Sequence, residues 1–207
     1  MSTTVPSSCG ALIFCDTGYK SPAFNGQYTG ATKAGLIRGA YHFARPDLSS
    51  GAAQADYFAS NGGGWSGDGI TLPGALDLEC KDHLPFTFWV HQLIPIVCGT
   101  DNPYGSNKCY GLSTGAMVTW IRDFSNAYHA KVHRYPVIYT STSWWELCTG
   151  NNGGFGDDNP LWLARYASSP GPLPAGWKYY TFWQYDDKSS NPGDPDVFNG
   201  DESGLKR

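Results

Sequence analysis

Apolar residues fall into short runs, separated by helical patterns and by loops rich in Gly, Pro, Asn and Ser. The short runs predict strands over residues 36–43, 76–79, 135–140, 161–166 and 179–186. Helices are predicted over residues 49–60, which place alanines at helical spacing, and over residues 113–129. Alternating strands and helices form parallel βα units. We therefore expect one α/β domain over residues 1–207, either an incomplete (β/α) barrel or an open doubly wound sheet.

The helix over residues 113–129 has the clearest pattern in the chain. Its apolar stripe consists of Leu112, Ala116, Trp120, Ile121, Phe124 and Tyr128. Residues 111–115 also match the G-x-S-x-G pattern of serine hydrolases, which requires a buried strand directly before it. A loop sequence stands there instead, so Ser113 is predicted to cap the helix.

The sharpest candidate site is the alternating stretch Ala75-Leu76-Asp77-Leu78-Glu79. On a strand, Asp77 and Glu79 share one face, about 7 Å apart along the chain. In a barrel this face is the interior, near the carboxyl ends where active sites lie. Two such carboxylates cannot both ionise freely, so one pKa rises, and the pair offers the acid and the anion of glycosidic cleavage. The alternative is a solvated edge strand with alternating charge.

Two further groups of side chains lie near predicted strand ends. Five aspartates, of which most suit ordinary turns, gather late in the chain, and Asp196 differs because the apolar pair Val197-Phe198 follows it. The aromatic residues at these strand ends either pack in the core or line a sugar-binding cleft. They are Tyr41, Phe43, Tyr139, Trp162, Tyr166, Trp183 and Tyr185.

Composition narrows the class of protein. The net charge of −4 excludes a basic nucleic-acid surface. Polar residues and Pro95 interrupt the longest uncharged stretch, residues 83–100, so no membrane span is expected. Six cysteines match no zinc pattern, and His129 and His133 lack the Glu of H-E-x-x-H, so we expect no metal or cofactor. The even cysteine count favours an oxidising compartment, although no signal peptide is evident.

Five motifs together carry a family resemblance. They are R-G-A-Y-H-F at residues 38–43, L-D-L-E at 76–79, Y-P-V-I-Y-T at 135–140, L-W-L-A-R-Y at 161–166 and F-W-Q-Y at 182–185. The chain resembles glycoside hydrolase family 25, the Chalaropsis-type lysozymes, most closely their fungal and actinobacterial branch. The similarity covers residues 16–79 and 102–206. It implies an irregular (β/α) barrel that cleaves the β-1,4 bond between N-acetylmuramic acid and N-acetylglucosamine in bacterial cell-wall peptidoglycan.

The resemblance also assigns roles to residues. Glu79 becomes the general acid, Asp77 stabilises the acetamido group or the cationic centre, and Asp196 matches a late aspartate of the family. Cys109 and Cys148 match a disulfide of relatives, and Cys80 is a possible partner of Cys98. The expected sugar-binding residues are Tyr41, Tyr139, Trp162, Trp183 and Tyr185. A secreted monomer is expected.

Two segments depart from the family pattern. The family begins with a strand of the type Gly-x-Asp-x-Ser, whereas residues 1–15 offer at most a substitute strand over residues 11–15 with no matching acid. Residues 80–101 form an apolar insertion directly after Glu79. Errors of a gene model and a genuine variant both fit, and we expect the chain as written to lyse walls poorly. The alternative functions are a carbohydrate-binding pseudoenzyme of the same fold and a hydrolase of another glycan such as chitin.

Overall fold

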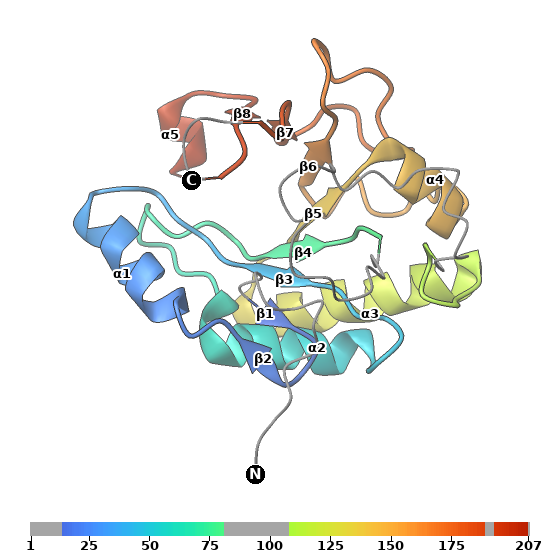
Figure 1. Ribbon diagram of the computed structural model, residues 1–207, viewed down its shortest axis with the longest axis horizontal. Helices are drawn as coiled ribbons and strands as arrows, with labels where there is room; N and C mark the ends of the chain where they lie inside the picture. Colours follow the sequence, from blue (N-terminus) through green and yellow to red (C-terminus); the bar gives the residue numbers. More distant parts are fainter. Residues whose placement is uncertain (1–13, 81–107, 189–192, 207) are drawn as a thin grey trace, which may run out of the picture.

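The computed structural model describes residues 14–80, 108–188 and 193–206. In these residues, eight strands form one curved sheet in the order β2-β1-β3-β4-β5-β6-β7-β8, with β2 and β8 as its two edges (Figure 1). The strands are β1 (Phe14–Cys15), β2 (Tyr19–Lys20), β3 (Tyr41–Phe43), β4 (Ala75–Asp77), β5 (Val137–Thr140), β6 (Leu161–Ala164), β7 (Phe182–Gln184) and β8 (Asp196–Phe198). All neighbouring strands pair in parallel except β1 with β2 and β7 with β8.

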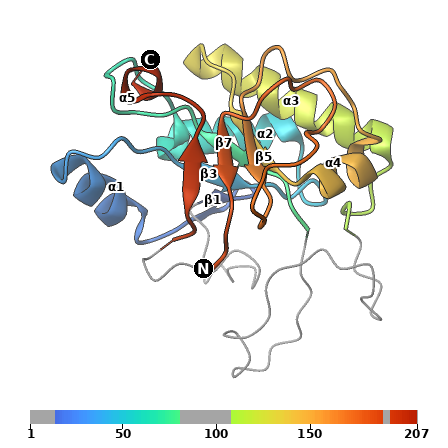
Figure 2. The same cartoon turned by 90° about the horizontal axis from the view of Figure 1, so that it is seen from above.

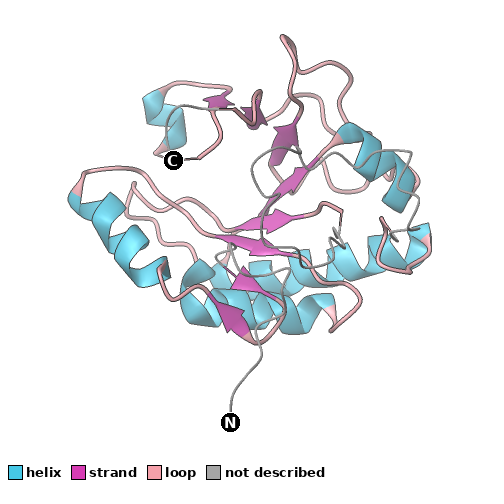
Figure 3. Ribbon diagram, viewed as in Figure 1, coloured by secondary structure: helices cyan, strands magenta, loops and turns pink. Residues whose placement is uncertain are grey.

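Two helices, α2 (Gly51–Phe58) and α3 (Thr114–Val132), lie side by side against one face of the sheet (Figures 1 and 2). Both begin at a serine cap, because Ser50 accepts from the backbone N–H of Ala53 and Ser113 from that of Ala116. The cap predicted at Ser113 is therefore present. The remaining helices, shown in cyan in Figure 3, are α1 (Phe24–Lys33), the π-helical turn η2 (Ala59–Gly63), α4 (Thr142–Thr149) and α5 (Glu202–Leu205).

The hydrophobic core lies between the sheet and these two helices. Leu76 of β4 and Ile138 of β5 are fully buried in it. His42 of β3 also points this way, because its ring lies 5.4 Å from that of Phe58 and 5.5 Å from that of Phe124. Side chains alternate along a strand, so the residues next to these three point to the opposite side, which we call the inner face.

The strands that the sequence predicts are all present, but each is shorter than predicted. β3 and β5 end at the last residue of their predicted runs, whereas β6 begins at the first residue of its run and stops two residues early. The antiparallel pairing of β7 with β8 was not predicted, and neither were helices α1 and α4. The substitute strand expected over residues 11–15 appears as β1, with residues 11–13 outside the described part. Residues 81–101 of the insertion also lie outside it. No described helix is long and apolar enough to cross a membrane.

Candidate active site

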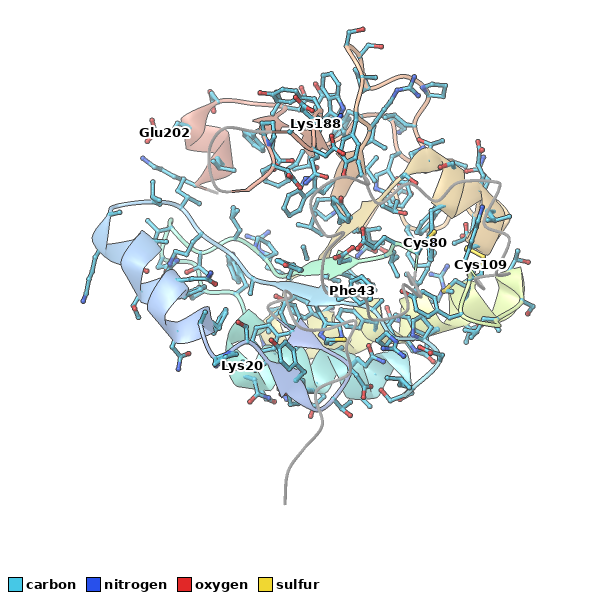
Figure 4. All side chains as sticks on the ribbon, in the orientation of Figure 1. Lys20, Phe43, Cys80, Cys109, Lys188 and Glu202 are labelled. Carbon is cyan, nitrogen blue, oxygen red and sulfur yellow. A yellow bond between two sulfur atoms is a disulfide. The ribbon has the colours of Figure 1, made fainter. Side chains whose placement is uncertain are left out.

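One row of paired residues crosses the inner face of the sheet. The register pairs Phe43 with Asp77, Asp77 with Tyr139, and Tyr139 with Trp162. In parallel strands paired side chains project to the same side, so these four project together. Figure 4 labels Phe43 near the middle of the molecule, with Cys80 marking the carboxyl end of β4. The row therefore lies near the carboxyl ends of the parallel strands, where (β/α) barrels place their active sites.

Asp77 and Glu79 remain on the same face, as the alternation predicts. Leu78 donates its backbone N–H to the carbonyl of Tyr139 at 2.9 Å, which continues the ladder beyond β4. Leu76 and Leu78 are both buried on the helix side. Glu79, two residues beyond Asp77, is half-buried.

Asp77 is the more enclosed of the two carboxylates. Its side chain is buried, and among the described residues its Oδ1 atom has no hydrogen-bond partner. Burial, and after it the negative charge of Glu79, raises the pKa of Asp77 well above its ordinary value. The sequence predicted that one pKa of the pair would rise, and the structure locates this rise at Asp77.

Three tyrosines surround the carboxylate pair. Burial comes first among the causes that raise the pKa of Tyr110, Tyr139 and Tyr166, and the charge of Glu79 contributes to each. Asp77 also raises the pKa of Tyr110 and Tyr139. Tyr110, which sequence reasoning missed, donates its hydroxyl to the carbonyl oxygen of Glu79 at 3.0 Å. These hydroxyls remain protonated and act as hydrogen-bond donors beside the carboxylates.

Gln184 is a second site residue that the sequence did not reveal. Its Oε1 atom accepts the hydroxyls of Tyr139 at 2.7 Å and Tyr166 at 3.0 Å. The register pairs Gln184 with Ala164 and Asp196, so it projects from the inner face. The sequence feature that could have indicated its role is a glutamine between aromatic neighbours within a predicted strand.

The structure places Trp183, which was expected with Tyr185 to bind sugar, on the other side of β7 from the central row. Trp183 pairs with Leu163, which is fully buried on the helix side, and Trp183 packs against that core. Its Nε1–H donates to the carbonyl of Arg165 at 2.9 Å, and its ring lies 5.8 Å from that of Tyr185. Because side chains alternate, the inner face at this strand carries Gln184 instead.

Asp196 and Trp162 meet on the inner face. The Nε1–H of Trp162 donates to Oδ1 of Asp196 at 2.7 Å, and the ring of Trp162 lies edge-on to Tyr139 at 5.3 Å. Burial raises the pKa of Asp196, while the hydrogen bond from Trp162 opposes that shift. The two predicted site residues are thus connected to Tyr139 in the central row.

Tyr41 and Asp16 lie apart from this group. Tyr41 pairs with Ala75, two residues nearer the amino ends of the strands than Phe43. It therefore shares the inner face but sits below the carboxylates. Asp16 follows β1, and its Oδ1 accepts the hydroxyl of Ser49 at 2.6 Å. This hydrogen bond ties the end of β1 to the segment that leads into α2.

The sequence profile of Glycosyl hydrolases family 25 matches residues 16–194. The chain belongs to this family. As a family 25 member it is a glycoside hydrolase, and its curved, unclosed sheet is an irregular barrel.

Relatives and solved structures agree with the family 25 assignment. The N,O-diacetylmuramidase of Arthroderma benhamiae is 53% identical over 191 residues, which cover 92% of this chain and 72% of the relative. That of a Chalaropsis species is 49% identical over 196 residues, covering 92% and 82%. The structure of a muramidase from Acremonium alcalophilum is 57% identical with a TM-score of 0.80, covering 93% of this chain and 82% of that chain.

The pair Cys109 and Cys148, implied by the family 25 resemblance, forms a disulfide with a Cα–Cα distance of 5.3 Å. It joins the loop before α3 to the end of α4 (Figure 4). Cys80 is also disulfide-bonded, but its predicted partner Cys98 lies outside the described residues. Among the described residues, no three His, Cys, Asp or Glu side chains gather closely enough to hold a metal ion.

Proposed function

We propose that this protein is a secreted peptidoglycan muramidase that cleaves the β-1,4 bond between N-acetylmuramic acid and N-acetylglucosamine. The observation that carries the proposal is the carboxylate pair Asp77 and Glu79, whose combined burial and charge repulsion raise the pKa of Asp77. Glycosidic cleavage needs one protonated and one ionised carboxyl group beside the scissile bond. The similarity to N,O-diacetylmuramidases supports peptidoglycan as the substrate.

In this mechanism, Glu79 is the general acid because it is the less buried carboxyl group and so the one that a bound glycan can reach. In the free enzyme, burial and then the charge of Glu79 raise the pKa of Asp77, so we place the shared proton of the pair on Asp77. When the acetamido N–H of the substrate reaches Oδ1 of Asp77, it stabilises the ionised form of this carboxylate. The proton of the pair then resides on Glu79, which donates it to the leaving glycosidic oxygen.

Ionised Asp77 is then the negative group nearest the positive charge that develops at the sugar's anomeric carbon. Asp196 adds a second negative charge, held in place by Trp162. The rings of Tyr139 and Trp162 offer apolar faces for the sugar. Gln184 accepts hydrogen bonds from the hydroxyls of both Tyr139 and Tyr166, so these two phenol rings are held in place before the substrate arrives.

The test is the identity of the bond that is cut. Purified bacterial walls are incubated with the protein, the soluble fragments are reduced with borohydride, and their ends are identified by mass spectrometry. We expect reduced N-acetylmuramic acid at the fragment ends. Reduced N-acetylglucosamine ends would overturn the bond assignment. Binding to walls with no soluble fragments would favour the pseudoenzyme alternative.

A further inference from the structure

A second pocket lies at the opposite end of the sheet from the carboxylates. Its volume is about 540 Å³, within the range of sites that hold small ligands. It is lined by residues that precede β4, β5 and β6 and by the end of α5. The amino ends of these parallel strands point away from Asp77 and Glu79, so the pocket is separate from the candidate active site.

The pocket gathers aromatic and cationic side chains. Its lining includes Trp65, His129, His133, Arg134, Tyr135 and Lys206. Among the described lining residues, Arg134 and Lys206 are cationic and Asp158 is acidic, and Glu202 pairs with Lys206, so Arg134 is the cation that no ion pair neutralises. A guanidinium without a counter-ion in a concave surface attracts anionic groups.

Arg134 is held for binding a planar anion. Its guanidinium carbon lies 4.5 Å from the centre of the Trp65 ring. A guanidinium stacked on an indole keeps its edge N–H groups free for two parallel hydrogen bonds to a carboxylate. In the described part of the chain, Arg134 forms no ion pair that would occupy these donors, unlike Lys206, which pairs with Glu202.

A second stacked pair stands beside the first. The ring of His129 lies 4.0 Å from that of Tyr135 with an angle of 13° between the planes, and both residues line the pocket. The pocket is thus lined by an imidazole, a phenol ring and an indole together with the guanidinium of Arg134. Aromatic faces with a nearby donor of this kind suit a carboxylate attached to a sugar or a short peptide.

We propose that this pocket is a second, non-catalytic binding site for a carboxylate-bearing unit of the wall polymer, the stem-peptide carboxylate of a muramyl unit. The inference rests on the proposed function, because that function brings the polymer to the protein. A site behind the barrel holds the enzyme on the insoluble wall while the carboxylate pair acts on a neighbouring strand.

The test uses the full chain with Glu79→Gln, and muramyl dipeptide as the probe. We expect a saturable change in the NMR signal of the Trp65 indole N–H during titration. Arg134→Gln should weaken this binding about tenfold or more, since it removes a charge-assisted hydrogen bond pair. Arg122→Gln is the matched control, because Arg122 lies on a different ring, 4.7 Å from that of Phe155, and should bind as the parent does.

Several outcomes would overturn the proposal. They are no saturable change at Trp65, equal affinity in Arg134→Gln and Arg122→Gln, and tighter binding of glycerol phosphate than of muramyl dipeptide. If Arg134→Gln fails to fold, Arg134→Lys keeps the charge without the planar fork and should still weaken binding several-fold. Because the readout is binding at Trp65, this result does not depend on which bond the enzyme cuts.

Discussion

The hydroxyl of Tyr139 donates a 2.7 Å hydrogen bond to Oε1 of Gln184, and the hydroxyl of Tyr166 donates to the same atom. This bond joins β5 to β7 across β6, directly beside Asp77, the strand partner of Tyr139. A neutral buried amide thus orients the phenol that stands next to the carboxylate pair.

Replacing Gln184 should therefore affect both stability and activity. Gln184→Ala leaves the buried hydroxyl of Tyr139 without its acceptor, which costs about 1–3 kcal/mol in the free energy of unfolding. Activity should fall as well, because the Tyr139 ring is no longer fixed. Urea unfolding and wall-lysis rates check both effects. The control is Tyr166→Phe, which removes a hydroxyl from a more exposed ring and should change stability by less than about 0.5 kcal/mol. Equal losses in the two variants would contradict the role of Gln184.

His42 should make the fold sensitive to acid. Burial lowers its pKa to about 4, from an ordinary value of 6.5. The folded state then binds fewer protons than the unfolded state between these values, so stability is full above about pH 6.5 and is lost as the pH falls toward 4. The loss amounts to about 3 kcal/mol.

His42→Gln tests this effect because glutamine does not titrate. We expect the variant's free energy of unfolding to vary less between pH 6.5 and 4 than that of the parent. The raised pKa of Asp77 acts in the opposite direction, since it favours the fold as the pH falls. Both proteins contain Asp77, so the difference between their curves isolates His42. Parallel curves would show that His42 does not titrate as its burial requires.

The Cys109–Cys148 disulfide should support the site as well as the fold. The bridged residues are 39 apart in sequence, and closing such a loop contributes on the order of 3–4 kcal/mol. Tyr110 follows Cys109 and contacts the carbonyl of Glu79. The double variant Cys109→Ala, Cys148→Ala should therefore have a lower unfolding midpoint and lose activity at temperatures where the parent is still active. Unchanged thermal inactivation would count against this role.

The pH dependence of cleavage should reflect the shared proton of the carboxylate pair. Because the pKa of Asp77 is raised, the pair keeps a proton at pH values where an isolated aspartate is ionised. We expect kcat/KM on soluble wall fragments to fall as the pH rises through the upper apparent pKa of the pair. In Asp77→Asn this alkaline limb should move. If the alkaline decline of kcat/KM stays at the same pH in Asp77→Asn, a titratable group other than Asp77 causes it.

The alternation of the sequence was enough to predict the carboxylate pair. Leu76 and Leu78, which alternate with Asp77 and Glu79, are buried, so only one face was available to the acids. The same reasoning is less decisive at β7, because Trp183 and Tyr185 are two aromatics that alternate with the amide of Gln184. Aromatic rings suit either a core or a sugar site, and pattern alone does not separate these uses.

Helices α1 and α4 were missed for different reasons. In α1 only Phe24 is buried and two glycines interrupt the helix, so it has no apolar stripe to detect. In α4 the signals existed, a cap at Ser141 and a left-handed Gly150 at its end, but the helix is only eight residues long. Tyr110 was also missed, because its contact with Glu79 spans 31 residues of the chain.

The most direct test of the mechanism compares Glu79→Gln with Glu146→Gln, an exposed glutamate on α4. Both variants are first shown to be folded by circular dichroism and to bind insoluble walls, and their rates on purified peptidoglycan are then measured. Removing the general acid should lower the rate of Glu79→Gln roughly 10²–10⁴-fold, whereas Glu146→Gln should match the parent. A Glu79→Gln protein that lyses walls at nearly the rate of Glu146→Gln would contradict Glu79 as the proton donor.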